Sequence, residues 1–163
     1  MIILGIDPGY ATLGFGIIES VGNTQKLIKY GSIVTPKTER FPSRLKYLAD
    51  EINNIINEFK PDAIVVEELF FQSNQKTAIL VAEARGVILL VAENSSAELF
   101  EYTPLQIKQV LTGYGHAEKK QIQQMVTVFL NLPTIPKPDD AADALAIALT
   151  HARSNSILGR FKI

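Results

Sequence analysis

The sequence predicts an α/β fold in which a mixed sheet carries helices on both faces. Residues 1–34 contain three strand patterns in hairpin order, and the rest of the 163-residue chain alternates helical and strand patterns. Strands joined by hairpins pair antiparallel, whereas strands joined through helices pair parallel, so the sheet should be mixed. No internal repeat, low-complexity segment or linker divides the chain. We expect a single domain over 1–155 and a short tail over 156–163.

The strands are placed by short apolar runs and by the turns that bound them. Residues 2–7 are rich in β-formers and stop at Asp7-Pro8-Gly9, which is typical of a buried strand that ends in a turn. Gly22-Asn23 suits a hairpin between the second and third strands. The run at 62–68 is rich in Val and Ile and fits a buried central strand. The five predicted strands are 2–7, 14–20, 26–34, 62–68 and 97–102.

The helices are placed by apolar residues at steps of three and four and by their end signals. In 42–59 this spacing gives an amphipathic helix, which Pro61 ends. Thr103 and Pro104 fit the N-cap and first residue of a short helix, which Gly113 breaks. The predicted helices are 42–59, about 74–93, 104–112, 118–132, and one from Asp139 or Asp140 to about 153.

The composition excludes several classes of protein. Apolar residues make up 47% and charged residues 20%, as in ordinary globular domains, and the net charge of −1 gives no global basic signal. No cysteine is present, which excludes disulfides, thiolate zinc sites and cysteine nucleophiles. We find no run long enough to span a membrane and no cationic start typical of a signal peptide. A cytoplasmic protein without membrane contact is therefore expected.

Four carboxylates occupy positions where a site could form. Asp7 and Glu67 close predicted buried strands, and Asp140 and Asp143 share one face of the last helix. Taken singly, each has an ordinary interpretation, because Asp before Pro-Gly is a common turn residue and acids favour the first turn of a helix. Asp143 is harder to explain in this way, because it is embedded in Ala and Leu.

Sites in such sheets gather at strand ends and nearby helix termini, so these four acids should converge if the two strands are neighbours. Their mutual repulsion would be relieved by a hard cation with oxygen ligands, with Mg²⁺ or Mn²⁺ favoured over Zn²⁺. Two such ions about 4 Å apart can activate water and stabilise a leaving oxygen in phosphodiester hydrolysis. Metal-dependent phosphodiester hydrolysis is thus the chemistry that the residues favour.

The sequence also resembles the RuvC family of Holliday junction resolvases over nearly its whole length. The resemblance rests on "ILGIDPG" with "GFGII", "FPSRLKYL", "VVEELFF" with "AEARGV", "FEYTPLQIKQVLTGYGHAEKKQIQQMV" and "DDAADALAIALTH". It implies a ribonuclease H-like fold and an endonuclease that uses Mg²⁺ or Mn²⁺, with two ions in each active site. The family acts in DNA recombination and repair as a homodimer that cuts two like strands of a four-way junction symmetrically. RuvA and RuvB branch-migration proteins are the further partners that it suggests.

By this resemblance the catalytic, metal-binding acids are Asp7, Glu67 rather than Glu68, Asp140 and Asp143. Some relatives carry His at the third of these positions, so Asp140 should be the least constrained. Asp139 is an additional acid, expected to cap the last helix, although the doublet leaves open whether it substitutes for Asp140.

The predicted DNA contacts lie around Gly113 and Gly115. Lys108, His116, Lys119 and Lys120 surround this turn, and the resemblance points especially to Lys108 and Lys119; ordinary solvated lysines are the alternative. A second basic cluster is interpreted as a solvated helix face, and it comprises Lys37, Arg40, Arg44 and Lys46.

Two aromatic residues, Phe70 and Phe71, should also lie beside the site. In the family an aromatic at the position of Phe70 helps to open the junction, and we assign core packing to Phe71. The apolar circumference of 74–93 indicates two buried faces, one of them either on a dimer partner or within the same subunit.

Two other functions are compatible with parts of the sequence. The segment "GIDPGYATLGFGII" also looks like the phosphate loop of an actin-like nucleotide-binding phosphotransferase, but such proteins need two of these domains around a cleft. A DNA-binding module that has lost catalysis is the second alternative, and the intact set of acids argues against it.

Overall fold

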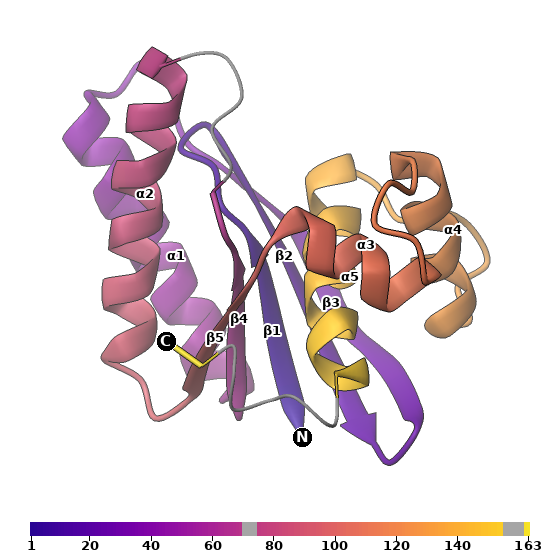
Figure 1. Cartoon of the computed structure of the whole chain (residues 1–163). Coiled ribbons are helices and arrows are strands. Elements are labelled where there is room, and N and C mark those ends of the chain that lie inside the picture. The colour runs from indigo at the N-terminus through magenta and orange to yellow at the C-terminus, as the bar shows by residue number, and fades with distance from the viewer. Residues whose placement is uncertain (70–74, 155–161) are drawn as a thin grey trace.

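The computed structural model describes residues 1–69, 75–154 and 162–163, which form a five-stranded sheet between two layers of helices (Figure 1). The strands are β1 (Ile2–Asp7), β2 (Thr12–Val21), β3 (Thr24–Val34), β4 (Ala63–Glu67) and β5 (Glu98–Tyr102). The helices are α1 (Phe41–Phe59), α2 (Gln75–Glu93), α3 (Pro104–Thr112), α4 (Lys119–Phe129) and α5 (Asp139–Arg153). No helix in these ranges is both long enough and apolar enough to cross a bilayer.

The sheet is mixed, as the sequence predicts. Its strand order is β3-β2-β1-β4-β5, with antiparallel pairs among the three leading strands and parallel pairs from β1 to β4 and from β4 to β5. The hairpin between β2 and β3 turns at Gly22, whose φ of 57° is a conformation that glycine adopts without steric cost. The central strands β1 and β4 are buried on both faces, which explains why they read as continuous apolar runs.

Alternate strand residues enter two separate cores. One core lies under α1 and α2 and contains Ile64 and Val66 of β4, whereas Val65 faces the core under α3, α4 and α5. Helices thus cover both faces of the sheet, and Figure 1 shows α1 and α2 on one side with the other three helices opposite. The expectation of helices on both faces is confirmed.

Helix α5 lies directly on the backbone of the sheet because glycines face it. A Cβ added to Gly5 in β1 or to Gly14 in β2 would clash with the backbone of α5, at Ala144 and Asp140 respectively. Side chains at these positions would hold the helix away from the sheet. The two glycines therefore set the close approach that brings the start of α5 to the end of β1 and the start of β2.

Most predicted helix ends agree with the structure, but the prediction that Asp139 caps the last helix is wrong. Thr103 caps α3, accepting a hydrogen bond from the Gln106 backbone N–H, while the Gln106 side chain accepts one from the Thr103 N–H. In α5, however, Pro138 occupies the N-cap position and Asp139 is the first helical residue. The side chain of Asp139 accepts from Lys137 instead of capping the helix (2.7 Å). The ion pair with Lys137 thus takes the place of the predicted capping hydrogen bond.

A buried histidine near the end of α5 should make stability depend on pH. His151 is 1% exposed, its Nδ1 lies 3.1 Å from the Tyr102 hydroxyl, and burial lowers its pKa to about 4. Between about pH 4 and the ordinary value near 6.5, the unfolded chain binds a proton that the folded chain excludes. Acidification through this window should therefore lower the free energy of unfolding by about 3 kcal/mol. Denaturant unfolding over the same pH range should show that the free energy of unfolding of His151→Gln falls less steeply than that of the parent. Equal pH dependence in the two proteins would mean that His151 is not the cause.

Candidate active site

Asp7 and Glu67 close adjacent parallel strands at the same edge of the sheet. Ile6 is paired with Val66, so the next residues, Asp7 and Glu67, lie side by side where β1 and β4 end. Both acids are partly buried. The chain order of strand, helix and parallel strand thus brings together two acids that are far apart in the sequence.

Both carboxylates project toward the α5 side of the sheet. Side chains alternate along a strand, so Asp7 shares the face of Gly5, which meets α5, and Glu67 shares the face of Val65. Glu68 follows β4 and is exposed. The structure therefore places Glu67, not Glu68, with Asp7.

The start of α5 brings two more acids to this edge. Gly14 pairs with Asp7 in the sheet and touches the backbone of Asp140, so the first turn of α5 lies beside Asp7. Asp143 follows one turn later on the same helical face. Asp140 and Asp143 are partly buried, whereas Asp139 is exposed and bonded to Lys137. Of the doublet, Asp140 is thus the one that faces the site.

The electrostatics of the site show a deficit of positive charge. Burial, together with the negative charges of Glu67, Asp143 and Asp140, raises the pKa of Asp7 to about 8. Burial and the charge of Asp143 raise the pKa of Glu67 to about 7. The pKa of Asp143 is also raised, chiefly by burial, even though Lys119 opposes the shift. These acids resist ionisation as they stand, and a bound cation would relieve that cost.

Lys119 neutralises part of the negative charge of the site. Its Nζ lies 2.7 Å from Oδ2 of Asp143 and 3.9 Å from Asp139. Burial alone would lower the pKa of Lys119, but the hydrogen bond and charge of Asp143 outweigh it and raise that pKa. The lysine thus acts as the counter-ion of Asp143.

The donor set fits a hard divalent cation once Asp143 is released from Lys119. Carboxylate oxygens are the ligands that Mg²⁺ and Mn²⁺ prefer, and the site supplies no sulfur donor. Among the described residues, no three acids or histidines are already arranged to hold an ion. The ion pair between Lys119 and Asp143 turns one candidate ligand toward an ammonium group.

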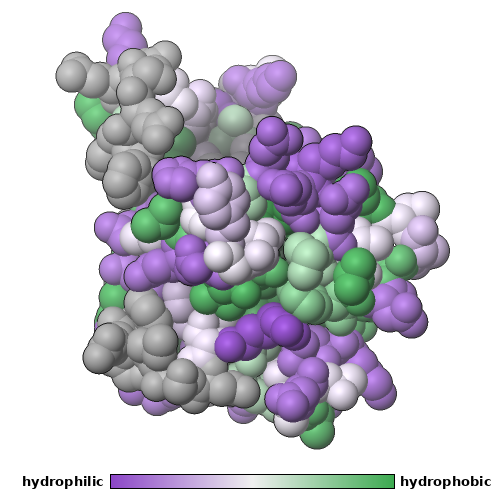
Figure 2. All heavy atoms as spheres, turned by 45° about the vertical axis from the view of Figure 1, so that its right-hand side comes forward, coloured by the Kyte–Doolittle hydropathy of each residue, from purple (hydrophilic) through white to green (hydrophobic). Residues whose placement is uncertain are grey.

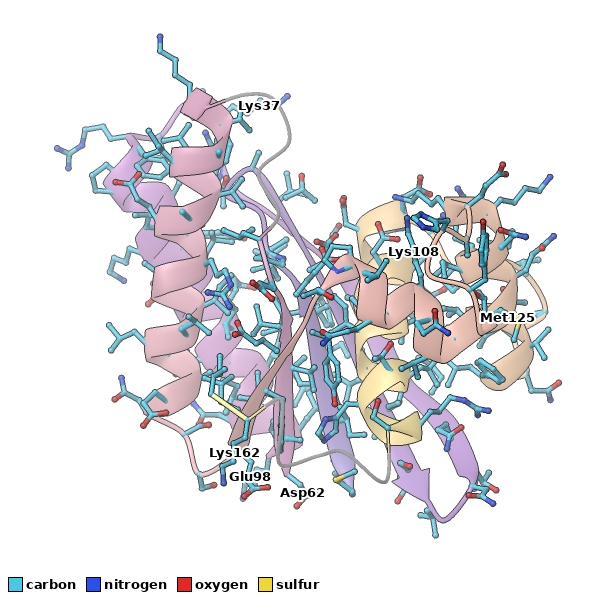
Figure 3. The ribbon with its side chains drawn as sticks, in the orientation of Figure 1. Lys37, Asp62, Glu98, Lys108, Met125 and Lys162 are labelled. Atoms are coloured by element: carbon cyan, nitrogen blue, oxygen red, sulfur yellow. The ribbon has the colours of Figure 1, made fainter. Side chains whose placement is uncertain are left out.

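A pocket of about 260 Å³ opens beside Glu67 and Asp143. Lys108 of α3 and Lys119 line it from the other side, above apolar side chains of α3 and α4. Figure 3 shows Lys108 pointing into the space between α3 and the strand ends, and Figure 2 shows hydrophilic side chains above an apolar band on this side of the molecule. The pocket therefore joins acids that could hold metal to cations that could hold phosphate.

Among the described residues, the remaining predicted DNA contacts and the second basic cluster do not line this pocket. Lys120 and His116 are exposed near the start of α4, and His116 stacks edge-on with Tyr114. Phe70 and Phe71 lie outside the described residues. In the second basic cluster, Lys46 pairs with Asp50 on the surface of α1, as a solvated face predicts.

Arg44 departs from that interpretation. It is half-buried, donates to Thr35 Oγ1 (2.8 Å) and lies over the ring of Tyr10, three residues after Asp7. Sequence reasoning also missed Arg85, which donates to the backbone carbonyl of Glu67 (3.4 Å). The available signal was a charged pair, Glu83 and Arg85, in the middle of a largely apolar helix.

The comparisons with known proteins agree with this geometry. The family model described as "Crossover junction endodeoxyribonuclease RuvC" matches residues 3–151. The chain belongs to the RuvC family. The RuvC of Alkaliphilus oremlandii, named crossover junction endodeoxyribonuclease, is 56% identical over 163 residues, with 100% of this chain and 99% of the relative covered.

Solved RuvC structures support the same assignment. Thermus thermophilus RuvC matches with a TM-score of 0.91 and 35% identity, covering 99% of each chain. A second structure, of T. thermophilus RuvC with a Holliday junction substrate, has the same TM-score and identity and covers 99% of this chain and 98% of that one. The fold is thus the ribonuclease H-like fold of a RuvC nuclease, and the actin-like alternative has no support. Membership of this nuclease family implies dependence on a divalent metal ion.

Proposed function

We propose that this chain resolves four-way DNA junctions by metal-dependent phosphodiester hydrolysis in recombination and repair. The observation that carries the proposal is the convergence of Asp7, Glu67, Asp140 and Asp143 at one edge of the sheet, in a chain of the RuvC family. The resemblance also leads us to propose cytoplasmic location, one domain over 1–155, and RuvA and RuvB as partners. The roles of Phe70 and Phe71 stay predictions from the sequence.

In this proposal the four acids hold two Mg²⁺ ions, with Mn²⁺ as a substitute. Two ions bound there would activate a water molecule and stabilise the leaving oxygen of the cleaved bond. Asp143 must exchange its ion pair with Lys119 for metal, and the freed ammonium then faces the pocket. Lys119 can there neutralise a phosphate close to the reacting bond.

The test of this proposal is cleavage of a synthetic four-way junction. With Mg²⁺ we expect symmetric cuts in two like strands, and with Ca²⁺ binding without cleavage. Linear duplex of the same sequence should be cut poorly. A protein that binds nucleotide and leaves junctions intact would overturn the assignment.

Lys108 and Lys119 are proposed to bind the DNA backbone, together with Lys120. Lys108→Ala and Lys119→Ala should each weaken binding to all junction sequences alike, because phosphate contacts carry no base information. Each should also reduce the slope of log K against log salt by about 0.9 on duplex arms. Lys46→Ala is the control, since that lysine pairs with Asp50 on α1. Unchanged slopes for both site variants would mean that these lysines are ordinary solvated surface.

Helix α2 is proposed to form the homodimer contact. Ile79 and Leu90 are 60% and 63% exposed, and both lie on the face that also carries Glu83 and the exposed Gly86. The alternative that α2 buries both faces within its own subunit does not fit these exposures. A second copy suits this face because a twofold dimer matches a junction with two equivalent strands.

Charges placed on this face should therefore separate the subunits. Ile79→Glu combined with Leu90→Glu should sediment as a monomer and nick single strands instead of making paired cuts. Val128→Glu is the matched control, because Val128 is an equally exposed apolar residue, 68% exposed, on α4. A double variant that remains dimeric would place the contact elsewhere.

A further inference from the structure

The carbonyl group of Glu67 lacks its backbone partner in the sheet. Glu68 donates its N–H to the Tyr102 carbonyl of β5 (2.9 Å), so the backbone of the preceding residue, Glu67, faces β1. By the register of β1 with β4, the residue that would donate to the Glu67 carbonyl is Pro8. Proline has no N–H to donate. The residue that ends β1 thus leaves the peptide of a candidate metal ligand without a ladder bond.

Arg85 of α2 supplies a donor at this position. Its Nε donates to the Glu67 carbonyl at 3.4 Å, which is long for a hydrogen bond. Its Nη2 forms an ion pair with Glu101 of β5, and the two side chains are only 17% and 30% exposed. A half-buried ion pair of this kind fixes a guanidinium group in one position. Glu101 therefore holds the donor in place.

Arg85 approaches Glu67 from the face of the sheet opposite to the carboxylates. Helix α2 packs on the α1 side of the sheet, where Ala84 and Ile88 enter the core, whereas the Glu67 carboxylate projects toward α5. Arg85 thus reaches the peptide of Glu67 without entering the space of the carboxylates. Because Glu101 neutralises its charge, Arg85 can fix the backbone without competing with a cation for the acids.

We propose that Arg85 is a positioning residue, which takes the place of the donor that Pro8 lacks and fixes the peptide that carries Glu67. This inference rests on the proposed role of Glu67 as a metal ligand. Arg85 belongs to "AEARGV" and Glu67 to "VVEELFF", so the two segments meet at this peptide.

The test compares Arg85→Met, Arg85→Lys and Glu101→Gln with Glu98→Gln. Glu98 is the matched control, because it also lies on β5 in an ion pair, with Lys162, but at the opposite end of the sheet (Figure 3). Arg85→Met should weaken Mn²⁺ binding to the DNA-free protein, and slow junction cleavage, about 10- to 100-fold, as supporting contacts of metal ligands do. The Mn²⁺ affinities and cleavage rates of Arg85→Lys and Glu101→Gln should lie between those of Arg85→Met and those of the parent. Junction affinity in Ca²⁺ should change less than about twofold, because the DNA-contacting lysines are untouched.

A second readout needs no metal. Amide hydrogen exchange at Glu67 and Glu68 should be faster in Arg85→Met than in the parent and unchanged in Glu98→Gln, because only the first loosens this strand end. A purely structural ion pair would lower the melting temperature but leave Mn²⁺ affinity per folded molecule unchanged, and that result would overturn the inference. If the parent protein itself neither binds Mn²⁺ nor cuts junctions, the proposed function fails instead.

Discussion

Replacing Asp7 with asparagine should abolish junction cleavage while leaving junction binding intact. Asp7 lies at the centre of the four acids, and Glu67, Asp143 and Asp140 all act on its pKa. Asparagine keeps the shape but removes the charge that would hold the metal ions, whose charge stabilisation is worth several kcal/mol in the transition state. Because each 1.4 kcal/mol is tenfold in rate, we expect a loss of about a thousandfold or more. Single-turnover cleavage in Mg²⁺ and junction affinity in Ca²⁺ measure the two quantities separately.

Glu67→Gln and Asp143→Asn should behave in the same way, and Glu68→Gln is the control. Glu68 lies next to Glu67 but is exposed beyond the end of β4. It should therefore retain near-normal turnover. If any one of these three variants still cuts at close to the parental rate, the residue that it replaces does not belong to the site.

The same Asp7→Asn substitution should stabilise the metal-free protein. The folded state holds the Asp7 proton up to about pH 8, whereas the unfolded chain releases it near 3.8, so the folded state loses stability as the pH rises between these values. Asparagine removes this loss, which is on the order of a few kcal/mol. Denaturant unfolding in EDTA at about pH 5 and about pH 8 should show the variant gaining most at the higher pH. A parallel pH dependence in both proteins would contradict this account.

Much of the fold could be predicted because local signals and tertiary packing agree. The Asp7-Pro8-Gly9 turn ends β1, Pro61 follows α1, and the Thr103 cap starts α3, each close to its predicted place. The register of the sheet could not be predicted, because it depends on how α5 and the strands pack. The sequence therefore predicts that the acids converge only if the strands carrying Asp7 and Glu67 are neighbours. In the structure these two strands are paired.

The site could be predicted as a set of acids but not as a set of contacts. Sequence spacing separates Asp140 and Asp143 by one helical turn, but it does not show that Asp139 pairs with Lys137. Neither does it show that Lys119 bonds Asp143 or that Arg85 reaches the Glu67 carbonyl. Such contacts join segments far apart in the chain, and a single sequence carries no record of distance between them.

Gly14→Ala should damage cleavage severely although the residue carries no functional group. A Cβ at Gly14 would lie far inside van der Waals contact with the backbone carbonyl of Asp140, so the first turn of α5 would have to move away from the sheet. Backbone cannot rotate aside as a side chain can, and overpacking of this kind costs about 1 to 3 kcal/mol. A displacement of about 1 Å in a catalytic group can cost about a hundredfold in rate. We therefore expect about a hundredfold slower cleavage with weaker Mn²⁺ binding.

Gly31→Ala separates this effect from the general cost of replacing a strand glycine. A Cβ at Gly31 would meet only the ring of Phe15, at 3.0 Å and 3.1 Å, and the end of a partly buried side chain can shift. That variant should keep near-parental cleavage. Rates should be measured below the melting temperature of each protein, so that the folded fraction is equal. If Gly14→Ala, folded at the assay temperature, cuts within about threefold of the parent, then the contact between Gly14 and Asp140 does not set the position of the two α5 acids.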